Sequence, residues 1–106
     1  MRFTIGRIWI KPGQRDEVEQ LAADYIKTSR AEDGCVYYDQ GHMFDDANGL
    51  VLVECWKTAA HHAAHTAAPH FSAFGPVFEK YVVNATFEEI DSDEINRIVI
   101  DPGKTT

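Results

Sequence analysis

The chain concentrates its histidines in one short segment. Four of its five histidines, His61, His62, His65 and His70, fall within ten residues, in an alanine-rich stretch that follows the apolar run ending at Trp56. Histidine is the usual side chain for moving protons, because its unperturbed pKa lies closest to neutral pH. The segment therefore predicts a pocket that handles an aromatic, ionisable small molecule, and the alternative is a solvated polar helix face.

Helical spacing distinguishes the four rings. His61 and His65 are four residues apart and share a face of the expected helix, whereas His62 points about 100° away and is expected in solvent. His70 follows Pro69 at a helix start, where its side chain can turn inward. We expect His65 to be the first candidate for the catalytic base and His70 the second, with His61 as a weaker candidate that contacts the substrate.

The strand that precedes this helix carries a second pair of candidates. Glu54 and Trp56 are two residues apart and so point to the same face of a strand. They predict a pocket wall in which an ionisable carboxyl lies beside an aromatic ring, with Trp56 among the catalytic residues and Glu54 binding substrate. The alternative is a core tryptophan with Glu54 paired to an arginine or a histidine, because a buried carboxylate needs a partner.

Three further residues are candidates for binding a substrate. Arg7 shares a strand face with apolar neighbours, where it could balance a substrate oxyanion or pair with Glu54 across the sheet. Tyr37 could donate a hydrogen bond to a ligand oxygen, although such a tyrosine is more often a core residue with a satisfied hydroxyl. Phe74 belongs to an aromatic helix face that packs on the sheet and could line a cavity.

Motifs for metals and cofactors are missing from the sequence. His61 and His65, at positions i and i+4, could chelate zinc, but the H-E-x-x-H pattern is absent and no carboxylate stands at helical spacing to complete the set. The G-x-G-x-x-G, G-x-x-x-x-G-K-S and G-x-S-x-G patterns are absent as well. We therefore expect no metal and no cofactor, so that any redox chemistry would come from the substrate itself.

Apolar periodicity predicts four strands and a set of helices. Strands are expected near residues 3–10, 35–44, 50–57 and 82–90, and helices near residues 14–31, 59–68 and 70–81. Pro69 separates the last two helices. The order β-α-β-β-α-β, with the second helix in two pieces, predicts an α+β fold of the ferredoxin-like type, with an antiparallel sheet and helices on one face.

The expected sheet is apolar on both faces in its first strand and at residues 51–53. Helices can cover only one face, and the other would leave a larger apolar patch than monomers usually expose. We therefore expect a homodimer built sheet to sheet. Residues 1–92 form the predicted domain, and residues 93–106 form a C-terminal tail that can pack on the partner subunit, because residues 95–100 are apolar.

Size and charge restrict the class of protein. A chain of 106 residues accommodates one domain. The net charge of −7 argues against nucleic acid or an anionic membrane surface as a partner, and no apolar run approaches the roughly 20 residues of a membrane span. The N-terminus lacks the features of a signal peptide. Cys35 and Cys55 are expected to be reduced core residues, so we expect a cytoplasmic protein.

A set of residues at fixed spacing resembles the antibiotic biosynthesis monooxygenase (ABM) family, and within it most resembles the small quinol monooxygenases. The set comprises Glu54-Cys55-Trp56, His61, His65, Pro69-His70, Lys11-Pro12-Gly13 and Glu32-Asp33-Gly34-Cys35. The resemblance covers roughly residues 1–90. It implies a dimeric α+β barrel in which two sheets pack face to face.

The resemblance also implies a reaction. Oxygenases of this family use neither metal nor flavin, and they act on an electron-rich phenol or hydroquinone whose anion can hand an electron to O₂. The implied activity is that of a cofactor-independent monooxygenase that oxidises a hydroquinone or polycyclic phenol with O₂. His65 or His70 would be the base, a role that typically contributes about 10²–10⁴-fold, and Trp56 would stack on the substrate ring.

Two alternatives share parts of the same pattern. Sugar-phosphate isomerases of the family carry the H-x-x-x-P-H segment that runs here from His65 to His70, so an isomerase that moves a proton on a small hydroxyketone, phosphorylated or not, stays open. A non-catalytic protein of this fold that binds a small ligand is the other alternative. Haem-degrading relatives carry a tryptophan near the position of His65 and an asparagine near Arg7, which disfavours haem degradation here.

Overall fold

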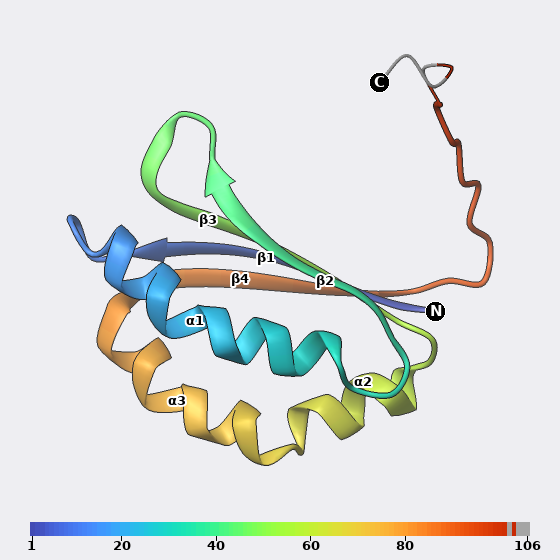
Figure 1. Ribbon diagram of the computed structural model, residues 1–106, viewed down its shortest axis with the longest axis horizontal. Coiled ribbons are helices and arrows are strands. Elements are labelled where there is room, and N and C mark those ends of the chain that lie inside the picture. The colour runs from blue at the N-terminus through green and yellow to red at the C-terminus, as the bar shows by residue number, and fades with distance from the viewer. Residues whose placement is uncertain (102, 104–106) are drawn as a thin grey trace.

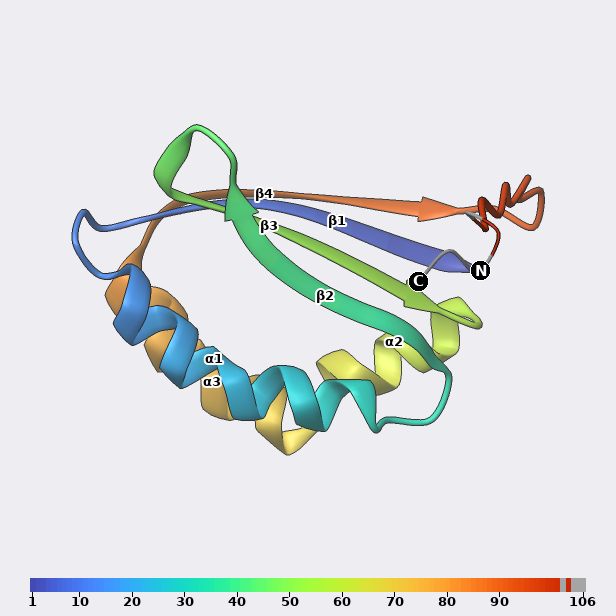
Figure 2. The ribbon, with the colours of Figure 1, turned by 45° about the horizontal axis from the view of Figure 1, so that its top comes forward.

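The structure is a computed structural model and describes residues 1–101 and 103; the remaining residues of the predicted tail, 102 and 104–106, lie outside the described residues. Four strands form one layer, and the helices cover one face of it (Figure 1, Figure 2). In chain order the elements are β1 (Arg2–Ile10), α1 (Arg15–Arg30), β2 (Cys35–Met43), β3 (Asp46–Trp56), α2 (Ala59–Thr66), α3 (Pro69–Tyr81) and β4 (Val82–Asp91).

The sheet has the strand order β2-β3-β1-β4, and every neighbouring pair is antiparallel. The central strand β1 is hydrogen-bonded to both β3 and β4, so that Thr4 lies opposite Glu54 on one side and Glu89 on the other. This arrangement confirms the predicted ferredoxin-like α+β fold. It also brings Thr4, near the start of the chain, and Glu89, near its end, side by side on the inner face of the sheet.

Short-range signals explain where the helices begin and end. Thr58 accepts a hydrogen bond from the backbone amide of His61 at 3.2 Å and so caps α2. Pro69 occupies the first turn of α3, where its missing amide proton would have had no helical partner. α1 has acidic residues in its first turn and basic residues in its last, which suits the helix dipole. None of the helices among the described residues is long and apolar enough to cross a membrane.

The core lies between the inner face of the sheet and the helices. Its buried members are Ile8, Ile10, Val18, Tyr38, Leu50, Leu52, Trp56 and Tyr81. Alternation along β1 and β3 sends every second side chain to this face. Full burial of a large aliphatic or aromatic side chain contributes roughly 1.5–3 kcal/mol. The strand that carries Glu54 and Trp56 is therefore held in place by its own inner-facing neighbours.

The turn between β2 and β3 differs from the prediction. Asn48-Gly49 predicts a hairpin loop over residues 45–49, but the turn falls at residues 44–45 and β3 already begins at Asp46. The Asp46 side chain accepts a hydrogen bond from the backbone amide of Asn48 at 2.9 Å, and the pairing register shifts next to Met43. The Asn-Gly pair thus lies inside the strand, beside an irregularity that accommodates it.

The outer face of the sheet carries apolar side chains that are uncovered in the part of the chain that the structure describes. Ile5 and Val51 are each 37% exposed, and Ile90 is 44% exposed. Residues 92–101 form neither helix nor strand and lead away from the domain (Figure 1). This face is the surface that the dimer prediction requires, and the dimer itself stays a prediction.

We predict that substitution of Ile5 by aspartate converts a dimer into a monomer. The cross-strand neighbours of Ile5 are Val53 and Glu88, so the new carboxylate is left unpaired in the interface, which opposes association. Wild-type protein at micromolar concentration should have twice the mass of the chain in size-exclusion chromatography with light scattering, whereas Ile5→Asp should have the mass of one chain. Leu21→Asp is the matched control, because Leu21 is similarly exposed but lies on α1, and it should stay dimeric. A monomeric wild-type protein would contradict the prediction.

Candidate functional site

A cavity of about 730 Å³ opens between the helices and the inner face of the sheet. Its walls are mostly aromatic and aliphatic and include Ile8, Tyr25, Tyr38, Leu52, Phe71, Phe74, Phe78 and Phe87. Small-molecule sites usually measure about 300–1,000 Å³ and have mostly apolar walls. The cavity therefore suits one small aromatic ligand, and Phe74 lies in its wall as the sequence predicts.

Polar groups in the cavity wall are few. They are Thr4, Gln40, Glu54, His62, Thr66, Glu79 and Glu89, and no lysine or arginine lines the cavity in the part of the chain that the structure describes. The hydroxyl of Thr4 is buried and has no hydrogen-bond partner among the described residues. Because an unpaired buried hydroxyl is unfavourable, this group is available to a ligand in the cavity.

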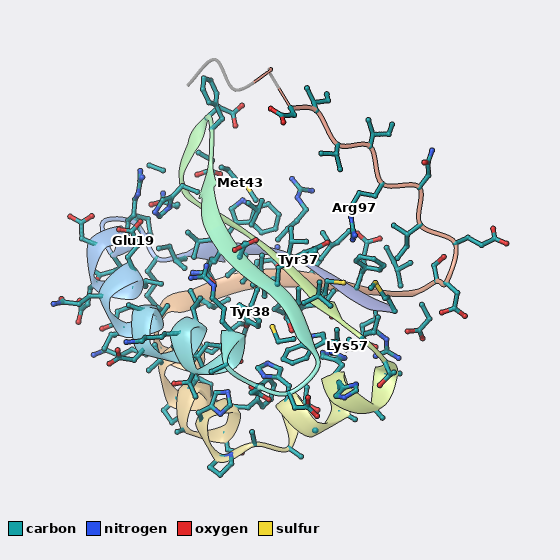
Figure 3. All side chains as sticks on the ribbon, turned by 45° about the vertical axis from the view of Figure 1, so that its right-hand side comes forward. Glu19, Tyr37, Tyr38, Met43, Lys57 and Arg97 are labelled. Atoms are coloured by element: carbon teal, nitrogen blue, oxygen red, sulfur yellow. The ribbon has the colours of Figure 1, made fainter. Side chains whose placement is uncertain are left out.

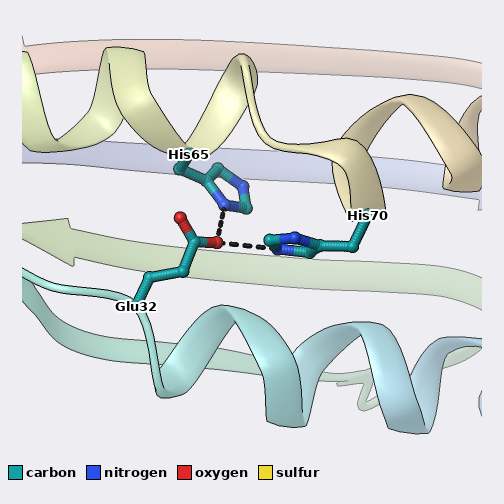
Figure 4. Close-up of side chains that lie close together, drawn as sticks. All are labelled: Glu32, His65 and His70. Carbon is teal, nitrogen blue, oxygen red and sulfur yellow. Dashed lines mark hydrogen bonds and ion pairs between the residues drawn. The ribbon is translucent and has the colours of Figure 1, made fainter.

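His65 lies directly behind the cavity wall and is only 1% exposed. Its Nδ1 is 2.6 Å from Glu32 Oε1 (Figure 4), and its Nε2 is 3.2 Å from the hydroxyl of Tyr25, which lines the cavity. A carboxylate can only accept hydrogen bonds, so Nδ1 carries the proton in the neutral ring. The lone pair of Nε2 then faces the Tyr25 hydroxyl, which links the buried imidazole to the cavity.

His70 binds the same carboxylate as His65. Its Nε2 is 2.7 Å from Glu32 Oε1 and 3.3 Å from Ser29 Oγ (Figure 4). The Ser29 hydroxyl donates to the backbone carbonyl of Tyr25 at 2.8 Å, so its oxygen accepts from His70. His70 therefore faces the end of α1, as expected for a ring that turns inward after Pro69, but it does not line the cavity.

Trp56 is fully buried and supports its neighbours instead of lining the cavity. Its indole nitrogen donates to Glu54 Oε1 at 2.9 Å, and its ring stacks on that of His65 with centroids 4.8 Å apart. The predicted stacking of Trp56 on a substrate ring is not supported by this position, because the imidazole occupies that face. Glu54 does line the cavity, next to the same tryptophan.

Burial shifts the protonation of several cavity groups. It raises the pKa of Glu54, and the hydrogen bond from Trp56 partly opposes this rise. It also raises the pKa of Tyr25 and of Tyr38, so both hydroxyls keep their protons at neutral pH. The cavity thus contains neutral tyrosine hydroxyl groups close to a carboxyl group that is easier to protonate than usual.

The prediction that His62 lies in solvent is wrong. The residue is only 6% exposed, because this face of α2 packs against the inner face of the sheet, where the ring of His62 lies 6.1 Å from that of Trp56. Arg2 donates from Nη1 to His62 Nδ1 at 3.0 Å, and burial lowers the pKa of this histidine, so its ring is neutral. His61 is the more exposed ring, with Nε2 3.5 Å from Asp33, and it does not reach the cavity.

Arg7 and Tyr37 lie on the outer face, away from the cavity. Arg7 pairs in register with Val51 and lies over the ring of Trp9, so the alternative that it pairs with Glu54 is wrong. The register of β2 shifts just before Tyr37, which therefore points outward; the cavity tyrosine of this strand is Tyr38 (Figure 3). A β-bulge of this kind reverses the face of the residues that follow it.

Sequence reasoning missed Glu32, Tyr25 and Tyr38. Glu32 and Tyr25 are separated from His65 by 33 and 40 positions, so no local spacing connects them. Tyr25 is one of several apolar residues at helical spacing, and only its hydroxyl distinguishes it from the core. The signal that could have singled out Glu32 is its position one residue before Asp33-Gly34, where α1 has ended and the chain turns toward β2.

Comparison with known proteins identifies relatives of this chain. A sequence profile described as antibiotic biosynthesis monooxygenase matches residues 1–76, more than half of the chain. An uncharacterized protein of Synechocystis sp. is 30% identical over 69 residues, which make up 65% of this chain and 47% of that protein. The chain thus spans about half the length of the curated relative that it matches.

Two solved structures have a similar fold. A protein from Pseudomonas aeruginosa has a TM-score of 0.77 at 26% identity, over 84% of this chain and 90% of that one. A candidate antibiotic biosynthesis monooxygenase from Deinococcus radiodurans has a TM-score of 0.85 at 18% identity, over 93% of this chain and 99% of that one. At this low identity, the second likeness concerns the fold alone.

We predict that the turn carrying Glu32 depends on Gly34. Gly34 has a φ of +79°, and a Cβ added there would collide with the His61 side chain. Gly34→Ala should therefore lower the free energy of unfolding by more than the roughly 1–2 kcal/mol of a left-handed alanine. Gly13→Ala is the matched control, because Gly13 has a φ of +78° but open space around it. Equal losses for the two variants in urea unfolding would contradict the collision.

Proposed function

The chain belongs to the antibiotic biosynthesis monooxygenase family, and we propose that it is a cofactor-independent monooxygenase that oxidises a hydroquinone or a polycyclic phenol with O₂. The observation that carries this proposal is the aromatic cavity, where the hydroxyl of Tyr25 is backed by the buried imidazole of His65. The Tyr25–His65 pair can take a proton from a phenol while the aromatic walls of the cavity contact the ring of that phenol.

The cavity favours an uncharged aromatic substrate. Its walls are aromatic, its polar groups include three carboxyl groups, and none of its lining residues in the described part of the chain is a lysine or an arginine. A phosphorylated hydroxyketone would bring two negative charges toward these carboxyl groups. Arg2, which contacts the lining residues His62 and Glu89, is already paired with Glu89 and Asp91. This observation argues against the sugar-phosphate isomerase alternative and supports a ring with hydroxyl groups, one of which could bind Thr4.

Proton removal would follow the hydrogen bonds behind the cavity. The substrate O–H transfers its proton to the Tyr25 oxygen while the Tyr25 O–H transfers its own proton to Nε2 of His65. No free tyrosinate is formed, which agrees with the raised pKa of Tyr25. The resulting imidazolium is stabilised by the Glu32 carboxylate at Nδ1 and by Glu54, whose Oε1 lies 3.9 Å from Nε2.

Oxidation then needs no bound redox group, because the phenolate is itself the reductant. It gives one electron to O₂, and the superoxide and phenoxyl radicals combine to form a carbon–oxygen bond at a ring carbon. Loss of the hydrogen at that carbon and cleavage of the O–O bond give a quinone and water. In total, one phenol and one O₂ give one quinone and one H₂O, and the proton held by His65 returns to the departing oxygen.

The remaining predicted residues would support this base. Trp56 would hold the imidazole of His65 by stacking on it. It would therefore position the base and would not itself stack on the substrate. His70 is the less suitable base, because its Nε2 faces Glu32 and Ser29 instead of the cavity. It would instead help to keep Glu32 in place.

We also propose that the protein acts as a homodimer. Proteins of this family commonly dimerise, and the apolar outer face of the sheet provides a surface that a second copy would cover. The tail from residue 93 onward would pack on the partner subunit, since Ile98, Val99 and Ile100 are 78–85% exposed in the single chain.

We predict that Tyr25→Phe lowers quinol-dependent O₂ consumption by about 10²–10⁴-fold, the usual contribution of general base catalysis. The substitution removes the hydroxyl that passes the proton and keeps the ring that lines the cavity. Tyr37→Phe makes the same change on the outer face and should keep the wild-type rate. An oxygen electrode and a panel of benzo- and naphthohydroquinones and polycyclic phenols provide the measurement.

Two results would contradict different parts of this account. If no member of the panel consumes O₂ faster than buffer with wild-type protein, the oxygenase proposal fails. If substrates are found but Tyr25→Phe retains the full rate, the reaction stands and the proton path through Tyr25 is wrong.

A further inference from the structure

We propose that Glu32, His65 and His70 form a binding site for a divalent transition metal such as Zn²⁺. The three side chains converge from the end of α1, from α2 and from the start of α3 (Figure 4). One carboxylate oxygen and one nitrogen of each ring all lie within 4.8 Å of one another. No motif in the sequence contains all three residues.

The donor set has the chemistry of a zinc site. Two imidazole nitrogens and one carboxylate oxygen are common ligands of Zn²⁺, at about 2.0–2.2 Å, which puts the ligand atoms of a tetrahedral site about 3.3 Å apart. Glu32 Oε1 is now 2.6 Å from His65 Nδ1 and 2.7 Å from His70 Nε2. Both separations are shorter than this spacing, so the Glu32 side chain, which lies beyond the end of α1, must withdraw from the two rings as the ion binds, and the rings must adjust with it.

For His65, a neighbouring group provides the outer contact that a metal-binding histidine usually has. A histidine that binds metal through one nitrogen normally gives the other N–H to an acceptor, and the Tyr25 oxygen lies 3.2 Å from Nε2 of His65. Ser29 Oγ lies 3.3 Å from Nε2 of His70, where it can hydrogen-bond a water on the ion. Three protein ligands leave the fourth position to such a water.

An ion can reach this site from the surface without entering the cavity. His65 is buried, but the side chains of His70 and Glu32 are 21% and 17% exposed. The pair that sequence spacing offers for zinc, His61 and His65, is separated in the structure, because His61 lies beside Asp33. The carboxylate that helical spacing could not supply comes instead from the end of another helix.

Metal binding would change the hydrogen bonding of His65. Nδ1 must lose its proton to bind the ion, so the neutral ring then carries its proton on Nε2 and donates to Tyr25. Nε2 can no longer accept a proton from the cavity. Inhibition of oxidation by Zn²⁺ follows from this change and rests on the proposed function, whereas the binding of the metal does not.

Calorimetric titration of chelator-treated protein with ZnCl₂ tests the site directly. Wild-type protein should bind one Zn²⁺ per chain. His70→Gln should weaken binding by more than about 100-fold, since loss of a ligand exceeds the roughly 10–100-fold effect of an outer contact. His61→Gln is the matched control: it removes a surface histidine beside a carboxylate and should bind as wild type.

Three results would overturn the proposal: no zinc binding by wild-type protein, equal binding by His70→Gln, or loss of binding in His61→Gln alone. Thermal melting checks that His70→Gln is folded. If it is not, a crystal of zinc-loaded wild-type protein decides the question by anomalous scattering. The proposal requires the peak between Glu32, His65 and His70, and a peak elsewhere on the chain contradicts it.

Discussion

The site depends on one constraint, which is that a fully buried imidazole needs a partner for each ring nitrogen. A buried polar group without a partner is unfavourable by roughly 1–3 kcal/mol. At His65, the carboxylate of Glu32 satisfies Nδ1 and the hydroxyl of Tyr25 satisfies Nε2. Because Glu32 can only accept, it also decides which nitrogen carries the proton. The arrangement that stabilises the fold therefore leaves a basic nitrogen directed toward the cavity.

The two faces of the sheet have different roles. The inner face holds Glu54 and the buried Trp56, which stacks on the imidazole of His65, and it forms one wall of the cavity. The outer face carries the exposed apolar side chains and Arg7, away from this chemistry. Strand alternation makes this division, and one β-bulge in β2 alters it by turning Tyr38 inward and Tyr37 outward. A shift of one residue thus decides which tyrosine a ligand can meet.

Local patterns were sufficient to predict the fold. Apolar periodicity and the signals at Thr58 and Pro69 place the strands and helices, and the histidine segment contains His65, which the structure places directly behind the cavity wall. What the sequence could not reveal are contacts made across the fold, such as Glu32 with His65 and His70. Parity arguments also fail after a bulge, as at Tyr37, and helical spacing alone could not tell that α2 buries the face of His62.

The tautomer of His65 in the ligand-free protein is the most direct test of this account. Long-range ¹H–¹⁵N correlations of the imidazole, recorded in mildly alkaline buffer, report which nitrogen carries the proton. We expect a neutral ring with the proton on Nδ1, donated to Glu32, and with Nε2 accepting from Tyr25. A ring protonated on Nε2, or an even mixture of both forms, would contradict it, because the imidazole would then present no fixed base to the cavity.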